Sequence, residues 1–192
     1  MTSTRLPVWV VPGDVSVTDL SCLALRGVVE HRSTEECAGI VAAVAWIRHT
    51  LRGPATGRDE LLITADIARS EVWAAASTRA DWSTPDLAAV CDTLGVAYWP
   101  PMEITPGYAW GVCATLRWLT GDDEQSPLGL PIRTSSGELA GEVLIYTRLL
   151  AAHQGQACDP AELRARARQL AIESRALAEL VLDTATRVRQ RA

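Results

Sequence analysis

The chain has 192 residues, a formal net charge of −5 and 48% hydrophobic residues. A chain of this length can bury roughly 70% of its unfolded surface, so it can form its own hydrophobic core. The mean hydropathy of +0.08 excludes global disorder. The longest mainly apolar run, 37–47, is shorter than the roughly 18 residues that a membrane span needs. Pro7 and Pro12 interrupt the apolar N-terminal stretch, which therefore lacks a secretory h-region. We expect a cytoplasmic protein without a membrane partner.

The charged residues and cysteines argue against several classes of function. All 18 basic residues are arginine, a usage typical of a GC-rich bacterial genome. The pI of about 5.2 disfavours nonspecific binding to nucleic acid, although 161–192 carries a local excess of arginine. None of the five cysteines forms a C-x-x-C pair, so we expect reduced thiols and no zinc site. No cofactor and no metal ligand is predicted.

The pattern of apolar residues, caps and breakers predicts a mainly α protein. In chain order we expect a short strand at 6–11, helices at 18–31, 33–51, 64–80 and 84–95, a second short strand at 96–99, and helices at 105–121, 135–153 and 159 to near the C-terminus. Capping boxes at Ser33 and Ser135 set two of the starts, and Gly95 sets one end. We expect a helical core domain over 1–158 and a long amphipathic helix over 159–192.

Two helical segments resemble one another at a constant offset of 72 residues. The segments 39–47 and 111–119 share a glycine at the start and a tryptophan seven residues later. In both, the glycine would let another backbone approach while the tryptophan fills the adjacent gap. The pattern indicates two similar helical units, about 8–80 and 96–153, with chance similarity of two buried helices as the alternative.

The C-terminal helix carries the clearest periodic signal. Apolar and small residues alternate at spacings of four and three, as in the seam of a two-stranded coiled coil. The predicted interface of a homo-oligomer consists of Leu163, Leu170, Leu177, Val181 and Val188. Packing of the same ridge on the chain's own body, or an arginine-rich contact with nucleic acid, are the alternatives.

Residues 98–110 combine four aromatic residues, three prolines and a methionine. Prolines stiffen a loop and aromatic side chains lose little entropy on docking, so this composition suits a surface that recognises a protein partner. The predicted partner-binding residues are Tyr98, Trp99, Met102, Tyr108 and Trp110. The alternative is that these rings cover the core.

Other segments give weaker signals. The acidic run 122–124 could bind a cation, and 53–58 superficially resembles an anion-binding turn, but neither has the full motif. The stretches 86–96 and 65–69 are similar to parts of a helix-turn-helix, although Pro100 and Pro101 fall where a recognition helix would be needed. No catalytic histidine, serine or cysteine motif occurs, so no catalytic residue is predicted.

The sequence favours a noncatalytic interaction or adaptor protein. It would self-associate through its C-terminal helix and present the aromatic, proline-rich segment to a protein partner. The alternative is a DNA-binding regulator with a degenerate helix-turn-helix. The third option is a small-molecule enzyme.

Overall fold

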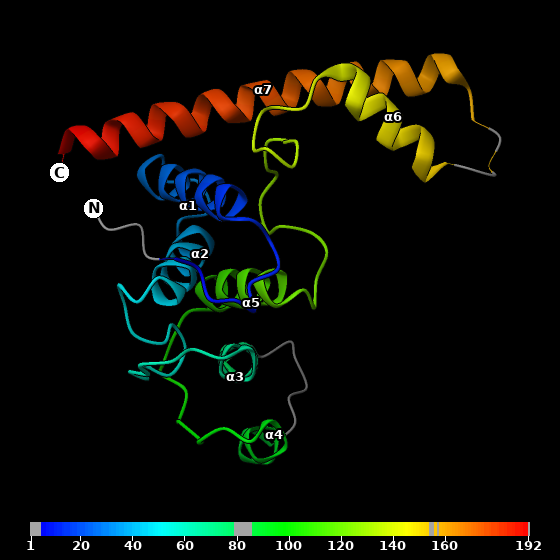
Figure 1. Cartoon of the computed structure of the whole chain (residues 1–192). Helices are drawn as coiled ribbons and strands as arrows, with labels where there is room; N and C mark the ends of the chain where they lie inside the picture. The colour runs from blue at the N-terminus through cyan, green and yellow to red at the C-terminus, as the bar shows by residue number, and fades with distance from the viewer. Residues whose placement is uncertain (1–4, 79–85, 154–155, 157, 192) are drawn as a thin grey trace. The chain divides into compact units, whose positions relative to one another are not determined.

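A computed structural model describes residues 5–78, 86–153, 156 and 158–191 of the chain (Figure 1). The contacts divide the chain into two compact units, Met1–Leu128 and Gly129–Ala192. We call them unit 1 and unit 2 and describe each by itself. The boundary between the units thus falls after Leu128, whereas the sequence suggested a domain boundary after residue 158. None of the helices in the described ranges is long and apolar enough to cross a membrane.

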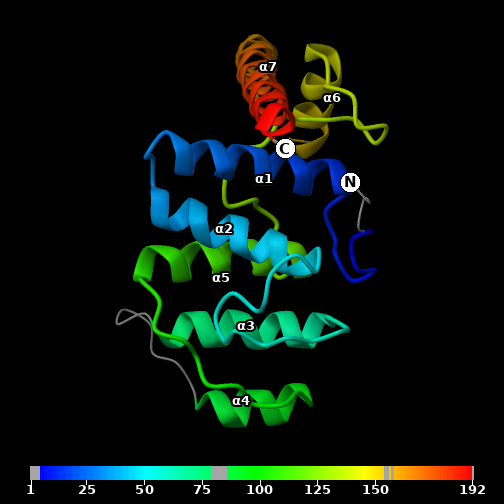
Figure 2. The ribbon, with the colours of Figure 1, turned by 90° about the vertical axis from the view of Figure 1, so that its left-hand side faces the viewer.

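The described residues of unit 1 form a stack of five helices. They are α1 (Asp14–Val29), α2 (Thr34–Ile47), α3 (Ala65–Ser77), α4 (Leu87–Leu94) and α5 (Pro106–Thr120). Their spatial order is α1, α2, α5, α3, α4, so the last helix of the unit lies between the second and the third (Figure 2). This order brings segments that are far apart in the sequence into contact at the centre of the unit.

The central helices α2 and α5 are buried because apolar residues surround most of their circumference. Ile40 and Ile47 of α2 and Leu116 and Leu119 of α5 are fully buried, and Trp46 is only 1% exposed. A surface helix would show polar residues on its outer face, whereas a helix that is apolar all round needs cover on both sides. Within unit 1, α2 is therefore a central, buried helix.

Two glycines allow α2 and α5 to cross at close range. A Cβ atom on Gly39 would collide with the carbonyl oxygen of Tyr108, and one on Gly111 would collide with that of Glu36. Since Tyr108 follows Glu36 by 72 residues, the two contacts are counterparts. The expectation that each glycine lets another backbone approach is confirmed. An internal duplication of the chain stays a prediction.

The helix ends predicted in unit 1 near 31, 33, 64, 95, 105 and 121 are confirmed, whereas α1 begins four residues before 18 and α2 ends four residues before 51. The end predicted at 80 and the start predicted at 84 lie outside the described residues. The Thr105 hydroxyl accepts a hydrogen bond from the Tyr108 N–H (3.4 Å), and Gly95 ends α4 with a φ of 66°. Ser33 does precede α2, but its φ is 44° and its side chain makes no capping bond. The capping box predicted at Ser33 is therefore wrong, because this left-handed backbone does not present the side chain to the helix.

The two short strands predicted in unit 1 are wrong, and the described residues contain no strand. In 6–11 the Val10 N–H bonds back to the Pro7 carbonyl (3.1 Å), while the Val11 N–H bonds to the Leu119 carbonyl at the end of α5 (2.9 Å). In 96–99 the Val96 N–H donates to the Cys91 carbonyl in the last turn of α4 (3.0 Å). These backbone groups are satisfied by turns and helix ends, so no ladder forms.

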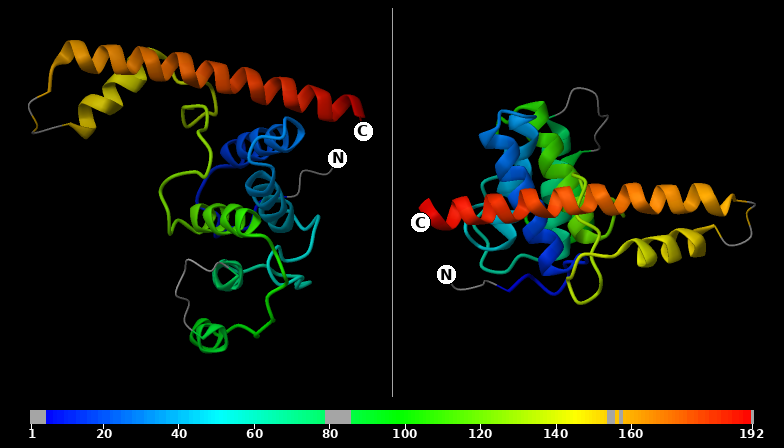
Figure 3. Two further views of the ribbon diagram at one scale, coloured as in Figure 1. Left: turned by 180° about the vertical axis from the view of Figure 1, so that it is seen from behind. Right: turned by 90° about the horizontal axis from the view of Figure 1, so that it is seen from above.

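In the part of unit 2 that the structure describes, two helices form a pair, α6 (Glu142–Ala152) and α7 (Pro160–Arg191). Figure 3 shows the short α6 beside the N-terminal part of the long α7. Ala140, Ile145 and Ala167 form the small core. The start of α7 is confirmed, since the Asp159 carboxylate accepts a hydrogen bond from the Ala161 N–H (2.8 Å).

The helix predicted to begin at Ser135 begins only at Glu142. The preceding residues form a turn in which the Thr134 N–H bonds to the Glu138 carbonyl (2.8 Å) and the Ala140 N–H to the Ile132 carbonyl (2.7 Å). The predicted capping box at Ser135 is wrong because the backbone bonds across this turn instead of along a helix.

Candidate interaction surface

A buried ion pair in unit 1 joins the segment 53–58 to α3. The Arg58 Nε is 3.2 Å from the Glu71 Oε1, and the two side chains are 1% and 0% exposed. Arg58 lies in the loop between α2 and α3, and Glu71 lies in the middle of α3. The Arg58 Nη1 is also buried and makes no hydrogen bond. Such a pair is costly to leave half complete, because either charge alone would be buried without compensation.

The Glu71 carboxylate organises the loop 53–58. It accepts hydrogen bonds from the backbone N–H groups of Ala55 (2.8 Å) and Thr56 (3.2 Å) and from the Thr56 hydroxyl. Burial raises the pKa of the Glu71 carboxyl, while these hydrogen bonds and the charge of Arg58 act to lower it. A Cβ atom on Gly53 would lie 2.6 Å from the Arg58 Cγ, so the loop needs glycine there. The segment that superficially resembled an anion-binding turn therefore binds a carboxylate of its own chain.

The same loop holds the backbone of residues 96–105, which we call the aromatic loop. The Arg58 Nη2 donates to the Ala97 carbonyl (3.0 Å). The Met102 N–H donates to the Ala55 carbonyl (2.8 Å). Two points of the aromatic loop are thus anchored, one to the buried arginine and one to the loop that Glu71 organises.

The large side chains on and beside this anchored backbone remain accessible. The exposed fractions are 51% for Tyr98, 38% for Trp99, 42% for Met102 and 37% for Trp110. Tyr108 is half-buried, and burial followed by the charge of Glu71 raises the pKa of its hydroxyl. Four of the five predicted partner-binding residues therefore offer apolar surface to solvent, although binding itself stays a prediction.

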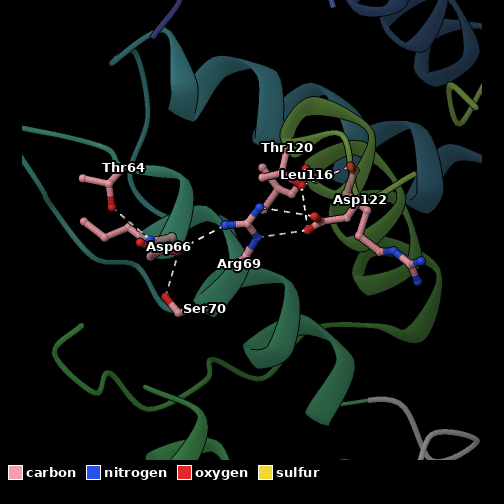
Figure 4. Close-up of polar contacts among 9 residues, drawn as sticks. Thr64, Asp66, Arg69, Ser70, Leu116, Thr120 and Asp122 are labelled. Carbon is pink, nitrogen blue, oxygen red and sulfur yellow. Dashed lines mark hydrogen bonds and ion pairs between the residues drawn. The ribbon is translucent and has the colours of Figure 1, made fainter. Parts of the chain in front are cut away.

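A second polar cluster joins α3 to the end of α5 (Figure 4). The Arg69 guanidinium contacts the Asp122 carboxylate through two nitrogens, at 3.2 and 3.3 Å, and also reaches Asp66 (3.2 Å). The Thr120 hydroxyl donates to the same Asp122 carboxylate (2.9 Å). Asp122, which the sequence offered as a possible cation ligand, is thus engaged in an ion pair. Within the described ranges no three His, Cys, Asp or Glu side chains are grouped so as to hold a metal ion.

The Asp122 cluster predicts a pH-dependent contribution to stability. Partial burial raises the pKa of Asp122, but the hydrogen bonds from Arg69 and Thr120 outweigh it, so the pKa lies below its ordinary value. The contribution is present above the unfolded-state pKa of about 3.9 and is lost as the pH falls through the lower folded-state value. Because Asp122 is 39% exposed, we expect Asp122→Asn to cost less than about 1 kcal/mol at neutral pH.

Urea unfolding of the wild type and of Asp122→Asn over a series of pH values checks this expectation. The difference between their free energies of unfolding should be greatest near neutrality and vanish in acid. A difference that grows as the pH falls would contradict the conclusion that the pKa of Asp122 is lowered in the folded protein.

The predicted interface residues of α7 fall into two groups. Leu163 is buried and Leu170 packs against the core of unit 2, and the Ile132 N–H donates to the Ser174 hydroxyl on the same ridge (2.7 Å). This first part therefore contacts the chain's own unit, which is the intramolecular alternative left open by the sequence. Leu177 is partly buried, Val181 is buried and Val188 is 43% exposed.

The structure also bears on the helix-turn-helix alternative. After α4 ends at Leu94 the next helix begins at Pro106, and the intervening 95–105 has no helix. A recognition helix would have to follow a short turn.

Comparisons with protein-family models, with curated proteins and with solved structures found no match for the chain.

Proposed function

We propose that the protein is a noncatalytic interaction protein that binds a protein partner through its aromatic loop. One observation carries the proposal: the backbone of the loop is anchored to a buried ion pair, while Tyr98, Trp99 and Met102 stay accessible. Trp110, which follows on α5, extends the apolar surface.

Physical arguments favour a partner over a purely structural role for this surface. Binding loses affinity when a loop must be ordered, so a loop whose backbone is already fixed retains more of its contact energy. Aromatic residues are frequent among the residues that dominate binding energy. A loop needed only to cover the core would direct these rings inward, where their burial would stabilise the fold.

Site-specific photocrosslinking in the native host tests the proposal. A benzophenone amino acid at Trp99 should form discrete adducts with another protein. The same probe at Leu61, a more accessible loop position of unit 1 (99% exposed against 38% for Trp99), should not. Adduct formation at position 99 should be suppressed by excess wild-type protein but not by excess Trp110→Ser/Met102→Ser variant.

Two outcomes would contradict the proposed function. The first is an adduct pattern that is the same at positions 99 and 61. The second is equal competition by the wild type and the double variant. Circular dichroism of the double variant serves as the control for folding, because both replaced side chains are partly exposed.

Self-association through α7 is a separate part of the hypothesis. With Leu163 and Leu170 directed to the core of unit 2 and Val181 buried, its remaining accessible candidates are Leu177 and Val188. It stays a prediction, and the experiment below distinguishes it from another mode of assembly.

A further inference from the structure

A groove of about 390 Å³ lies between the start of α6 and the middle of α7 in unit 2. Arg168, Ile172 and Arg175 of α7 form one side, and Leu139, Gly141 and Glu142 form the other. Ile172 is 64% exposed, so the groove offers an apolar side chain between two arginines. A surface of this kind suits a segment that carries both an apolar side chain and a negative charge.

The charges of the groove are only partly compensated within unit 2. Arg168 pairs with Glu142 at 3.1 Å, whereas Arg175 is exposed and forms no ion pair with any described residue. Gly141, the N-cap of α6, provides no side-chain capping bond. The first N–H groups of α6 therefore add positive potential at the same end of the groove.

The aromatic loop has the complementary chemistry. Glu103 is exposed, follows Met102 directly and has no ion-pair partner among the described residues. Unit 1 carries a net charge of −7, from nine arginines and sixteen acidic residues. Unit 2 carries +2, from nine arginines and seven acidic residues. Opposite charges on the two surfaces favour encounter and fix the orientation of docking.

We propose that the groove of one molecule receives the aromatic loop of a second copy. Met102 would contact Ile172, and the Glu103 carboxylate would pair with Arg175. The inference rests on the proposed function and names the partner as the chain itself. Because the two surfaces differ, each molecule offers one loop and one groove, and the assembly is head-to-tail.

Light scattering of the full chain at micromolar concentration tests the inference. The wild-type mass should exceed 20.7 kDa, rise with protein concentration and fall as salt is added. Arg175→Glu and Glu103→Arg should each reduce the mass to that of the monomer. Placing both substitutions in one chain should restore association, because the ion pair is re-formed with its charges exchanged.

Mixing the two single variants gives the sharpest result. Arg175→Glu retains its loop and Glu103→Arg retains its groove, and the altered loop and altered groove also carry opposite charges. Each variant alone should therefore stay at 20.7 kDa, whereas the mixture should recover the concentration-dependent association of the wild type. Matched controls are Glu124→Arg, an exposed acid of unit 1 outside the loop, and Arg189→Glu, an exposed arginine of α7 outside the groove. Both controls should associate like the wild type.

Three results would overturn the inference: a monomeric wild type, single variants that associate like the wild type, or a mixture that stays monomeric. Association that Val188→Ser abolishes and the charge variants leave unchanged would show pairing through α7 instead. If crosslinking at position 99 still captures a different protein while the wild type is monomeric, the proposed function stands and this inference fails.

Discussion

Replacing Glu71 with glutamine is expected to lower the free energy of unfolding by about 3–5 kcal/mol, the usual cost of breaking a buried ion pair from one side. The carboxylate and the Arg58 guanidinium are both essentially inaccessible, so the substitution leaves an uncompensated positive charge inside unit 1. Glutamine keeps only one acceptor oxygen, so it cannot serve both the N–H groups of Ala55 and Thr56 and the Thr56 hydroxyl. The substitution should therefore destabilise the loop 53–58 as well as the ion pair.

Urea unfolding followed by circular dichroism measures this effect. The control is Glu30→Gln, which breaks the partly exposed Arg26–Glu30 pair on α1 and should cost less than about 1 kcal/mol. Replacing Arg58 with methionine in the Glu71→Gln background should recover part of the loss, because the lone buried charge is then removed. Glu71→Gln with wild-type stability would contradict the assigned role of the pair.

Replacing Gly39 with alanine is expected to destabilise unit 1 by about 3 kcal/mol, at the upper end of the usual cost of overpacking. The added Cβ would meet the backbone of α5 at Tyr108 and Val112. A backbone cannot rotate away as a flexible side chain can, so α2 and α5 would have to separate. Helix propensity alone predicts that Gly39→Ala stabilises the protein, since alanine is about 1 kcal/mol more favourable than glycine in a helix interior.

Thermal and urea unfolding of Gly39→Ala and Gly111→Ala should show losses of similar size, because the two glycines make counterpart contacts. Gly13→Ala and Gly141→Ala are the matched controls. Both are N-cap residues, and a Cβ atom at either position meets no atom within 4 Å, so each substitution should cost less than about 1 kcal/mol. Stabilisation by Gly39→Ala would exclude the close helix crossing.

Local signals in the sequence predicted the helices well and the strands badly. Thr105-Pro106 and Gly95 each act on backbone groups a few residues away, and the helix ends they predict are confirmed. The V/W/Y-rich stretches 6–11 and 96–99 have strand-like composition, but their conformation depends on distant partners such as the Leu119 carbonyl and Arg58. Strand propensity describes a fit to a pleated surface, and the described residues provide no such surface.

The sequence predicted the aromatic side chains of the candidate site but not the buried ion pair that anchors them. The aromatic side chains were visible in the composition of 98–110, because their effect does not depend on a partner elsewhere in the chain. The segment 53–58 superficially resembles an anion-binding turn, but its pairing with Glu71 was not predicted, since an arginine in a loop and a glutamate in a helix are ordinary surface residues until the fold buries them together. Glu71 precedes the apolar Val72 and Trp73, which was a weak sign of burial.

Hydrogen exchange of the Met102 amide tests most directly whether the buried pair fixes the aromatic loop. In the wild type this amide should exchange slowly, as the helical amides of α3 do, because it donates to the Ala55 carbonyl. The neighbouring Glu103 amide should exchange fast, and Glu71→Gln should make the Met102 amide fast as well. If the Met102 and Glu103 amides exchange equally fast in the wild type, the loop is not anchored and the account is wrong.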